Sequence, residues 1–341
     1  MRTRRRGLVL LVLLAMLLAC VPVSAASKSY SDVPKTHWAY GSICSAAQKG
    51  LLQGVGANRF GLGQEMSRAA YAAALCRLMD WETVVPAKGS FSDNQDAKKW
   101  YYSAIETAYA NGAITKQSAL CRPTDAISRE EMAVMTVRAL GYTALSGLVQ
   151  ESCPFSDVST NRGYVTLAYQ MGLVTGADAF SFAPQRSLTR EEAAVVLVRV
   201  YERRNAAIMQ LSTAAPESAV RVESVSGTSG SVPMSPRAPL EAVYAAAVRA
   251  NGGAVVLHAV PLRQTVQSKK ADAGTEIPKT EVVELIENGA EAYRSARYAS
   301  SYLLYRDGGK AYVVWYESDA DLAEKVMLCR LLGVKTVYLE R

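Results

Sequence analysis

Apolar residues recur at helical spacing in three stretches of the chain between residues 30 and 206. In the first stretch, Ala72, Leu75, Cys76 and Met79 follow the i, i+3, i+4, i+7 pattern that places side chains on one face of a helix. The same register returns at 133–140 and at 194–201. The pattern therefore predicts three helices, over about Ser67–Asp80, Ser128–Leu140 and Thr189–Arg203.

A second helix is expected ahead of each of these. The three earlier helices cover about Trp38–Lys49, Lys99–Asn111 and Asn161–Met171, and a glycine follows each, as is typical of the left-handed residue that ends a helix. One helical hairpin of this size buries its own apolar face poorly. Three hairpins packed around a shared axis bury it well, so we expect a three-copy helical-hairpin bundle that is mainly α.

Two polar positions also repeat. Arg68, Arg129 and Arg190 are 61 residues apart, and each opens one of the later helices. Asp32, Asp93 and Asp157 each follow an aromatic residue and a serine, upstream of the earlier helices. A period of this length indicates one supersecondary unit used three times, with copies over 29–86, 90–148 and 153–206.

The remainder of the chain has a different character. Residues 212–238 are rich in Ser, Ala, Gly and Pro and are expected to form a flexible linker. Residues 239–341 are expected to form a small α/β domain of unknown role. Its expected elements are helices over Leu240–Asn251, Glu281–Ser295 and Asp319–Leu332, strands over Ala254–Val260 and Thr336–Leu339, and a hairpin joining Tyr302–Tyr305 to Ala311–Tyr316.

The N-terminus has the layout of a secretory signal over residues 1–26. A basic segment, Met1–Arg6, precedes an apolar run, Gly7–Ala19, and then small residues. Lipidation at Cys20 is the alternative. The apolar run is short for a transmembrane span, so we expect a secreted mature chain without one.

Charge and cysteine content exclude several classes of function. The formal net charge of +7 includes four arginines of the signal segment, so the mature chain carries about +3 (7 less 4), too little to favour nucleic acid as a partner. Removing Cys20 leaves five scattered cysteines, an odd number that does not suit a disulfide framework. With two histidines and no Cys-x-x-Cys motif, we expect no metal site and no cofactor.

Two of the arginine-bearing turns match a capping box. Ser128 with Glu131, and Thr189 with Glu192, have the spacing at which each side chain bonds the other residue's backbone N–H. The box does not account for the arginine, because a cation in the first helical turn opposes the helix dipole. Its recurrence indicates an anion site. The alternative is that each arginine pairs with an acidic residue of a neighbouring copy, for which Asp32, Asp93 and Asp157 are the natural partners. Both hold if the aspartates orient the arginines.

Two tryptophans strengthen the case for a sugar ligand. Trp38 and Trp100 begin the earlier helices of two copies, where an indole ring near a charged groove suits stacking on a sugar. The alternative for each is ordinary core packing. The third copy has Gly163-Tyr164 in place of tryptophan.

These motifs together resemble the S-layer homology domain family, over about Tyr30–Tyr201. The resemblance implies a pseudo-threefold helical bundle that anchors a secreted protein to an anionic, often pyruvylated, cell-wall polysaccharide. It further implies that Arg68, Arg129 and Arg190 contact the anionic group and that Trp38 and Trp100 contact sugar rings. The first copy departs from the family pattern, because Ala69-Ala70 stands where acidic residues are usual.

The tail faintly resembles the closing part of a family 18 glycoside hydrolase barrel, through Lys310–Asp319 and Gly333–Tyr338. A complete barrel takes about 250 residues, and the Asp-x-x-Asp-x-Asp-x-Glu acid motif is absent from the sequence. Glu317 alone does not make a glycosidase, which needs two placed carboxylates. We therefore expect a cell-wall-binding protein rather than an enzyme. The alternatives are a wall hydrolase whose tail does the chemistry and a self-assembling surface-layer subunit.

Overall fold

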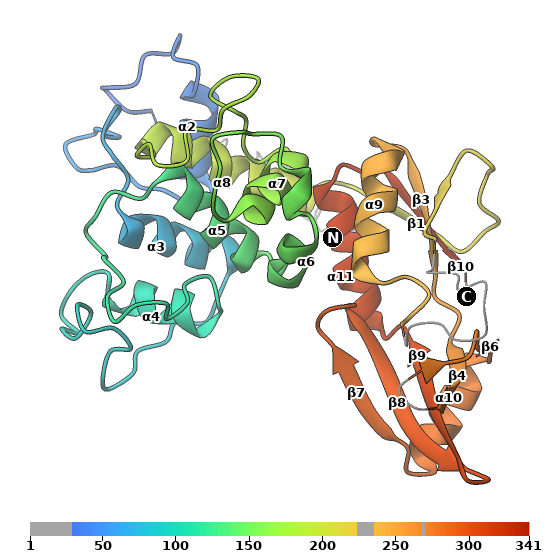
Figure 1. Cartoon of the computed structure of the whole chain (residues 1–341). Helices are drawn as coiled ribbons and strands as arrows, with labels where there is room; N and C mark the ends of the chain where they lie inside the picture. The colour runs from blue at the N-terminus through green and yellow to red at the C-terminus, as the bar shows by residue number, and fades with distance from the viewer. Residues whose placement is uncertain (1–28, 224–234, 268–269, 341) are drawn as a thin grey trace, which may run out of the picture.

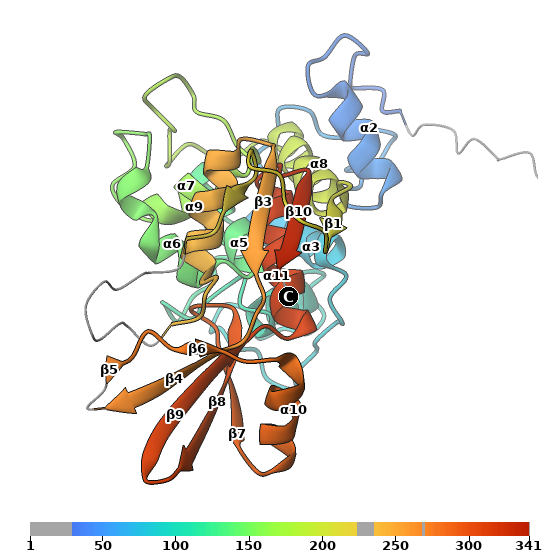
Figure 2. The ribbon, with the colours of Figure 1, turned by 90° about the vertical axis from the view of Figure 1, so that its right-hand side faces the viewer.

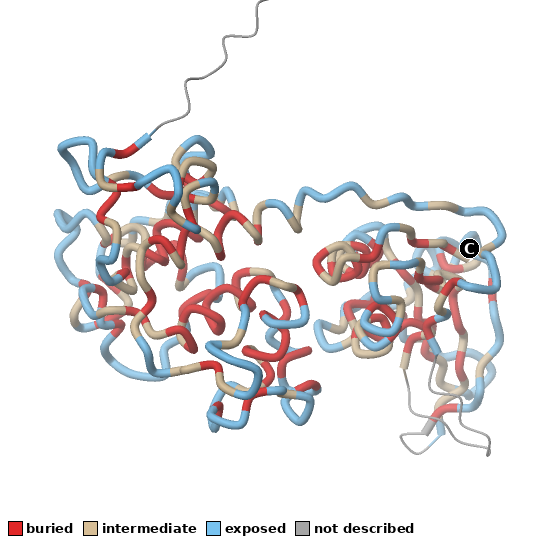
Figure 3. The backbone as a smooth tube through the Cα atoms, turned by 90° about the horizontal axis from the view of Figure 1, so that it is seen from above, coloured by how far each residue is buried: buried red, intermediate tan, exposed pale blue. Residues whose placement is uncertain are grey.

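The computed structural model describes residues 29–223, 235–267 and 270–340. Within these ranges the chain has mixed α/β content, and its buried residues gather in two lobes, the repeats and the tail (Figures 1 and 3). The expected signal segment 1–26, with Cys20, lies outside the described residues. No helix in the described part of the chain is long and apolar enough to cross a bilayer.

All six helices expected in the repeats are present. The earlier helix of each copy is α2 (Tyr40–Gln48), α4 (Tyr102–Ala110) or α7 (Arg162–Gln170), and the later helix is α3 (Arg68–Met79), α5 (Arg129–Ala139) or α8 (Arg190–Asn205). A short helix, α6 (Thr143–Leu148), and a 3₁₀ turn, η1 (Gln150–Ser152), join the second copy to the third. Trp38 and Trp100 lie just before α2 and α4, not within them.

The helices pair between copies, which corrects the expected hairpins. Helix α3 packs chiefly against α4, α5 against α7, and α8 against α2, so each later helix takes the earlier helix of the following copy as its partner. The physical reason is the extent of burial. Nine of the eleven residues of α5 are buried, and two neighbouring copies are needed to cover so many side chains.

The segments that enter the three later helices meet at one point. The backbone N–H of Met66 donates to the carbonyl of Leu188 at 2.8 Å, that of Leu188 donates to Ile127 at 2.9 Å, and that of Ile127 donates to Met66 at 2.8 Å. The three side chains are fully buried. The hydrogen bonds form a closed ring, so each copy contacts both others at this point.

The tail begins with a parallel sheet. Its strand order is β1 (Met209–Leu211), β10 (Thr336–Glu340), β3 (Ala254–His258) and β2 (Val220–Arg221). Helices α9 (Leu240–Ala250) and α11 (Asp319–Leu331) cover the face of this sheet that is turned toward the repeats (Figures 1 and 2). Parallel strands need crossover connections, and the chain uses these two helices for that purpose.

A second, antiparallel sheet is inserted between β3 and α11. Its main path is β5 (Lys270–Ala271), β4 (Leu262–Gln267), β9 (Lys310–Tyr316), β8 (Ser300–Asp307) and β7 (Glu291–Ser295), with β6 (Thr275–Glu276) paired to β4. Helix α10 (Lys279–Glu287) packs on one face, where Val282 belongs to one buried apolar cluster with Leu303 and Val314.

Two sequence predictions in the tail were wrong in part. The helix expected over Glu281–Ser295 ends at Glu287, because Gly289 adopts a φ of +90° and turns the chain into strand β7. The segment 212–238 is not wholly a flexible linker. Val220 pairs with Val255 of β3 and Val222 is buried, since a parallel edge and an apolar surface are available to them; residues 224–234 lie outside the described part.

The two lobes are in direct contact. Tyr142, just before α6, is buried and donates its hydroxyl hydrogen to the carbonyl of Glu324 in α11 at 3.2 Å. Arg330 Nη1 donates to the carbonyl of Arg204 in α8 at 2.9 Å. One cluster of buried apolar residues continues from the repeats into the tail, so the tail is docked against the repeats.

Candidate functional site

The three repeated arginines lie where one copy meets the next. In each case Nε donates, at 2.9 Å, to a backbone carbonyl in the loop of the following copy: Arg68 to Cys121, Arg129 to Phe182 and Arg190 to Phe60. We call these contacts junction 1 (Arg68 with 121–131), junction 2 (Arg129 with 182–192) and junction 3 (Arg190 with 60–70). Each arginine therefore has a structural role in joining copies.

The arginines are largely but not completely withdrawn from solvent. Arg129 is 8% exposed and the Arg68 side chain 12%, while Arg190 is partly exposed. Burial lowers the pKa of both Arg129 and Arg190 from the usual value, although an arginine stays charged in proteins. The guanidinium groups therefore remain cationic at the edges of the junctions.

Among the described residues the three aspartates form no ion pair with these arginines, so the expected choice of partner was wrong. An acidic residue of a neighbouring copy does pair with Arg68, but it is Glu131, at 2.9 Å. Asp32 accepts the backbone N–H groups of Phe60, Gly61 and Leu62 at 2.7, 2.8 and 3.1 Å. Asp93 and Asp157 accept equivalent bonds at 2.8–2.9 Å: Asp93 from Cys121 and Arg122, and Asp157 from Phe182 and Ala183. The short aspartate side chain reaches the loop amides, and the arginine binds the carbonyl of the same loop.

Electrostatics favour ionised aspartates here. Burial alone would raise the pKa of Asp32 and of Asp93, but the backbone N–H groups stabilise the carboxylate, and the pKa of each is lowered. The aspartates thus orient the arginines indirectly, by holding the loop that both contact.

Both expected capping boxes are present, and they also take part in the junctions. Ser128 accepts from the Glu131 N–H at 3.2 Å, and Thr189 accepts from the Glu192 N–H at 3.4 Å. The same glutamates face the arginine of the preceding copy. Glu131 lies 2.9 Å from Nη1 of Arg68 and also binds Arg122, while Glu192 lies 4.0 Å from Nη1 of Arg129 and 2.5 Å from Arg186.

A second series of arginines was missed by the sequence analysis. Arg77, Arg138 and Arg199 are again 61 residues apart; the first two lie in the last turn of α3 and α5, and the third in the middle of α8. Each reaches the loop that follows the earlier helix of its own copy: Arg77 to the Leu51 carbonyl at 3.3 Å, Arg138 to Thr115 Oγ1 at 3.0 Å, and Arg199 to the Leu173 carbonyl at 3.2 Å. The period that revealed the first series would have revealed the second.

The two arginine series meet in a cavity at junction 1. This cavity, of about 480 Å³, is lined by Arg68, Arg122 and Arg138 and by polar side chains that include Gln117 and Asn161. Glu130 and Glu131 also line it. The lining offers many hydrogen-bond donors and a cationic wall, which suits a hydroxyl-rich ligand with a negative group.

The tryptophans are exposed, so core packing is not their role. Trp38 is 66% exposed and Trp100 is 65% exposed. Trp38 borders a hollow of about 280 Å³ between α2 and α8, together with Arg199 and Glu202. In the third copy the equivalent position, two residues before α7, is Thr160, and the next residue, Asn161, lines the junction 1 cavity. Each of these two cavities is therefore bordered by one arginine of the second series and one residue of the next copy. These are Arg199 with Trp38 in the smaller cavity and Arg138 with Asn161 at junction 1.

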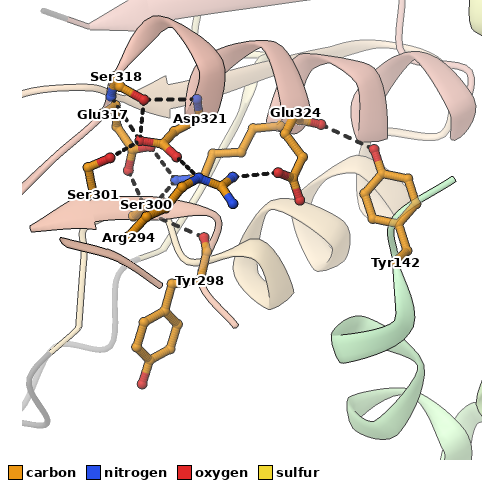
Figure 4. Close-up of polar contacts among 10 residues, drawn as sticks. Tyr142, Arg294, Tyr298, Ser300, Ser301, Glu317, Ser318, Asp321 and Glu324 are labelled. Atoms are coloured by element: carbon orange, nitrogen blue, oxygen red, sulfur yellow. Dashed lines mark hydrogen bonds and ion pairs between the residues drawn. The ribbon is translucent and has the colours of Figure 1, made fainter. Parts of the chain in front are cut away.

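Glu317, the acidic residue singled out in the tail, belongs to a buried polar network (Figure 4). It is 6% exposed, accepts from Ser300 Oγ at 2.9 Å and forms an ion pair with buried Lys325 at 2.5 Å. Burial raises the pKa of Glu317 to about 7. Nearby Asp321 binds Ser301, Ser318 and Arg294. Glu317 also lines a mainly apolar cavity of about 440 Å³ beside Ile277 and Leu322.

Comparison with known proteins finds relatives of these repeats. A family model for the S-layer homology domain matches residues 29–72 and 154–194. The chain is 31% identical to an amylopullulanase of Thermoanaerobacterium thermosulfurigenes over 183 residues, which are 52% of this chain and 10% of that protein. It is 27% identical to an S-layer protein of Bacillus thuringiensis subsp. finitimus over 206 residues, 59% of this chain and 25% of that protein. It is 28% identical to the S-layer protein sap of Bacillus anthracis over 182 residues, 52% of this chain and 22% of that protein.

The chain thus spans a quarter or less of the length of these three relatives. Among solved structures, the spore cortex-lytic enzyme SleL of Bacillus cereus matches with a TM-score of 0.30 and 14% identity, over 35% of this chain and 30% of that one. SleL of Bacillus megaterium matches with a TM-score of 0.29 and 14% identity, over 33% and 28%. Likeness at this level is faint and carries no argument about function.

Proposed function

The chain carries S-layer homology domains, and from this premise we propose that it is a secreted cell-surface protein held non-covalently by an anionic, for example pyruvylated, cell-wall polysaccharide. The observation that carries the proposal is the cavity at junction 1, where Arg68, Arg122 and Arg138 come together. A guanidinium group binds a carboxylate through paired, charge-assisted hydrogen bonds. Polar side chains beside it can bind sugar hydroxyls.

We propose further that the three copies form a pseudo-threefold unit with an equivalent site at each junction. The closed ring of hydrogen bonds through Met66, Ile127 and Leu188 supports this arrangement. So does the repetition of the Arg–carbonyl bond at 2.9 Å in every junction. In this arrangement Trp38 and Trp100 offer exposed rings to sugar units next to two of the junctions.

The tail supports no second candidate function. A hydrolase needs a carboxyl group that can reach substrate together with a second carboxylate. The carboxylate of Glu317 is engaged by Lys325 and Ser300, and that of Asp321 by Arg294 and two serines. We propose that these groups join β8, β9 and α11 and that the tail is the part displayed at the cell surface.

The proposal can be tested by sedimentation of the full chain with purified cell-wall sacculi. The double variant Trp38→Ala/Trp100→Ala removes two exposed rings and leaves the buried core intact, so its melting temperature should match the wild type. Loss of two stacking contacts should weaken binding at least about tenfold.

The matched control is Val85→Ala, which truncates another exposed apolar side chain (63% exposed) outside the helices. Its binding should equal that of the wild type. Undiminished binding by the tryptophan double variant would remove the assigned role of these rings, and failure of the wild-type chain to sediment with sacculi would reject the anchoring function.

A further inference from the structure

The three junctions differ in how the repeated arginine is neutralised. Glu131 at junction 1 and Glu192 at junction 2 are the third residues of α5 and α8, and each faces an arginine of the preceding copy. The corresponding third residue of α3, 61 positions before Glu131, is Ala70. At junction 3, the position equivalent to the glutamate that faces Arg68 or Arg129 is therefore occupied by alanine, which has no carboxylate to offer Arg190.

Arg190 has no ion pair with any residue that the structure describes. Its Nε donates to the Phe60 carbonyl and its Nη2 to the Gln53 carbonyl at 2.6 Å, and no hydrogen bond among the described residues engages Nη1. Two carboxylates lie in its neighbourhood, and backbone amides bind both of them. Asp32 accepts three N–H groups of the loop, and Glu191 accepts the N–H of Gly63 at 3.0 Å.

Glu131 shows what geometry a carboxylate adopts at such a junction. It approaches Nη1 of Arg68 at 2.9 Å while its second oxygen accepts the N–H of Ser128 at 3.0 Å. A ligand carboxylate at junction 1 would have to displace this intramolecular partner, whose effective concentration is very high. At junction 3 the equivalent donors are Arg190 Nη1 and the backbone N–H of Ser67, and among the described residues no side-chain carboxylate binds either of them.

We propose that junction 3 is the site that takes the carboxylate of the wall polysaccharide, and that Ala70 determines this selectivity. The ligand chemistry is a sugar that bears a carboxylate substituent. At junctions 1 and 2 the protein's own glutamate competes with the ligand carboxylate for the arginine, so these two junctions bind it more weakly than junction 3. This inference rests on the proposed anchoring function and adds which junction reads the negative charge.

The test substitution is Ala70→Glu, because α3 already has the partner that the new side chain needs. Ser67 accepts the N–H of residue 70 at 3.2 Å, so Ser67 with a glutamate at 70 completes the capping box found in α5 and α8. The variant should therefore fold and melt at or above the wild-type temperature. Ala70→Gln is the matched control, since glutamine also completes the box but carries no charge.

The measurement is the affinity of the full-length variants for purified wall polysaccharide that carries pyruvate ketals. Ala70→Glu should bind at least about tenfold more weakly than the wild type, and Ala70→Gln should bind within about twofold of it. Equal affinity of the glutamate and glutamine variants would overturn the inference. If both bind like the wild type, the charge at position 70 has no effect; if both bind more weakly, the size of the side chain rather than its charge is responsible.

A reciprocal variant tests the same inference at junction 1. Glu131→Gln keeps the capping box and removes the carboxylate that faces Arg68, so affinity for the pyruvylated polymer should rise. Unchanged or lower affinity would contradict the assigned role of Glu131. If the wild-type chain binds the polymer and the variants at 70 do not differ, the inference fails while the anchoring function stands; if the wild-type chain does not bind, the anchoring function itself fails.

Discussion

At the scale of single residues, the repeated loop is held from two sides. The aspartate accepts the N–H of Gly61, Arg122 or Ala183, and the arginine of the preceding copy donates to the carbonyl at the other end of the same peptide group, that of Phe60, Cys121 or Phe182. Each side chain thus fixes one end of a peptide dipole. The repeated motif is structural as well as a candidate for binding, and a substitution at the arginine would disturb both roles.

Asp93→Asn tests the contribution of the aspartate. Its two oxygens accept the N–H groups of Cys121 and Arg122, and asparagine offers one oxygen and no charge. The free energy of unfolding at pH 7 should fall by about 1–2 kcal/mol, measured by urea denaturation.

The effect of Asp93→Asn should depend on pH. The folded-state pKa of Asp93 is lowered, so the stabilisation is present above the unfolded pKa, near 4, and is lost as the pH falls through the folded pKa. The difference between wild type and variant should therefore shrink below about pH 4. A difference that stays constant from pH 7 into this acid range would contradict the charge-based explanation.

Local sequence predicted part of this site. The capping boxes at Ser128 and Thr189 could be found because both partners lie three residues apart. The partner of Arg68 could not be predicted from local sequence, because the Cys121 carbonyl lies 53 residues along the chain. Sequence left an Asp–Arg ion pair open as an alternative, since opposite charges that recur together suggest contact, but the backbone amides of the loop bind the aspartates instead.

At the scale of elements, helix α7 approaches its neighbour α6 closely at a glycine. In α7 the second residue is Gly163, and a Cβ there would lie 1.7 Å from the carbonyl oxygen of Ser146 in α6. In α2 the equivalent second residue is Gly41, and a Cβ there would meet nothing within 4 Å. The same position is thus closely packed in one copy and open in another.

The two glycines make a matched pair of substitutions. Gly163→Ala should lower the free energy of unfolding by about 2–4 kcal/mol, because backbone atoms would have to separate. Gly41→Ala should raise it by up to about 1 kcal/mol, because alanine is the better helix former. Thermal unfolding of both variants measures this, and equal melting temperatures would contradict the close approach of α6 and α7.

Sequence predicted the existence of these helices but not their partners. The apolar period fixes which face of a helix is buried, and all three copies share it, so nothing in the pattern says whether α3 packs on α2 or on α4. In the tail, the apolar positions of Glu281–Ser295 fit a helix throughout. The turn at Gly289 ends the helix early, and residues 291–295 instead pair with β8 as a strand.

At the scale of the whole molecule, the tail is docked rather than tethered. Helices α9 and α11 lie between the parallel sheet and the repeats, and Tyr142 and Arg330 bond across the boundary (Figure 1). A tail fixed in this way would hold the antiparallel sheet at a set distance from the junctions that are proposed to bind the wall. Sequence indicated a repeat region and a tail region of mixed α/β type. It did not predict that the two are in contact, because a contact between regions produces no periodic pattern in the sequence.

The most direct test of the anchoring claim is the affinity of the full chain for one wall polysaccharide before and after its carboxyl groups are reduced to alcohols. The sugar backbone stays the same, so the comparison isolates the charge that the arginines of the junctions are proposed to bind. Affinity for the reduced polymer should be at least about tenfold lower, as expected for loss of a charge-assisted pair. Equal affinity for the two polymers would contradict the account.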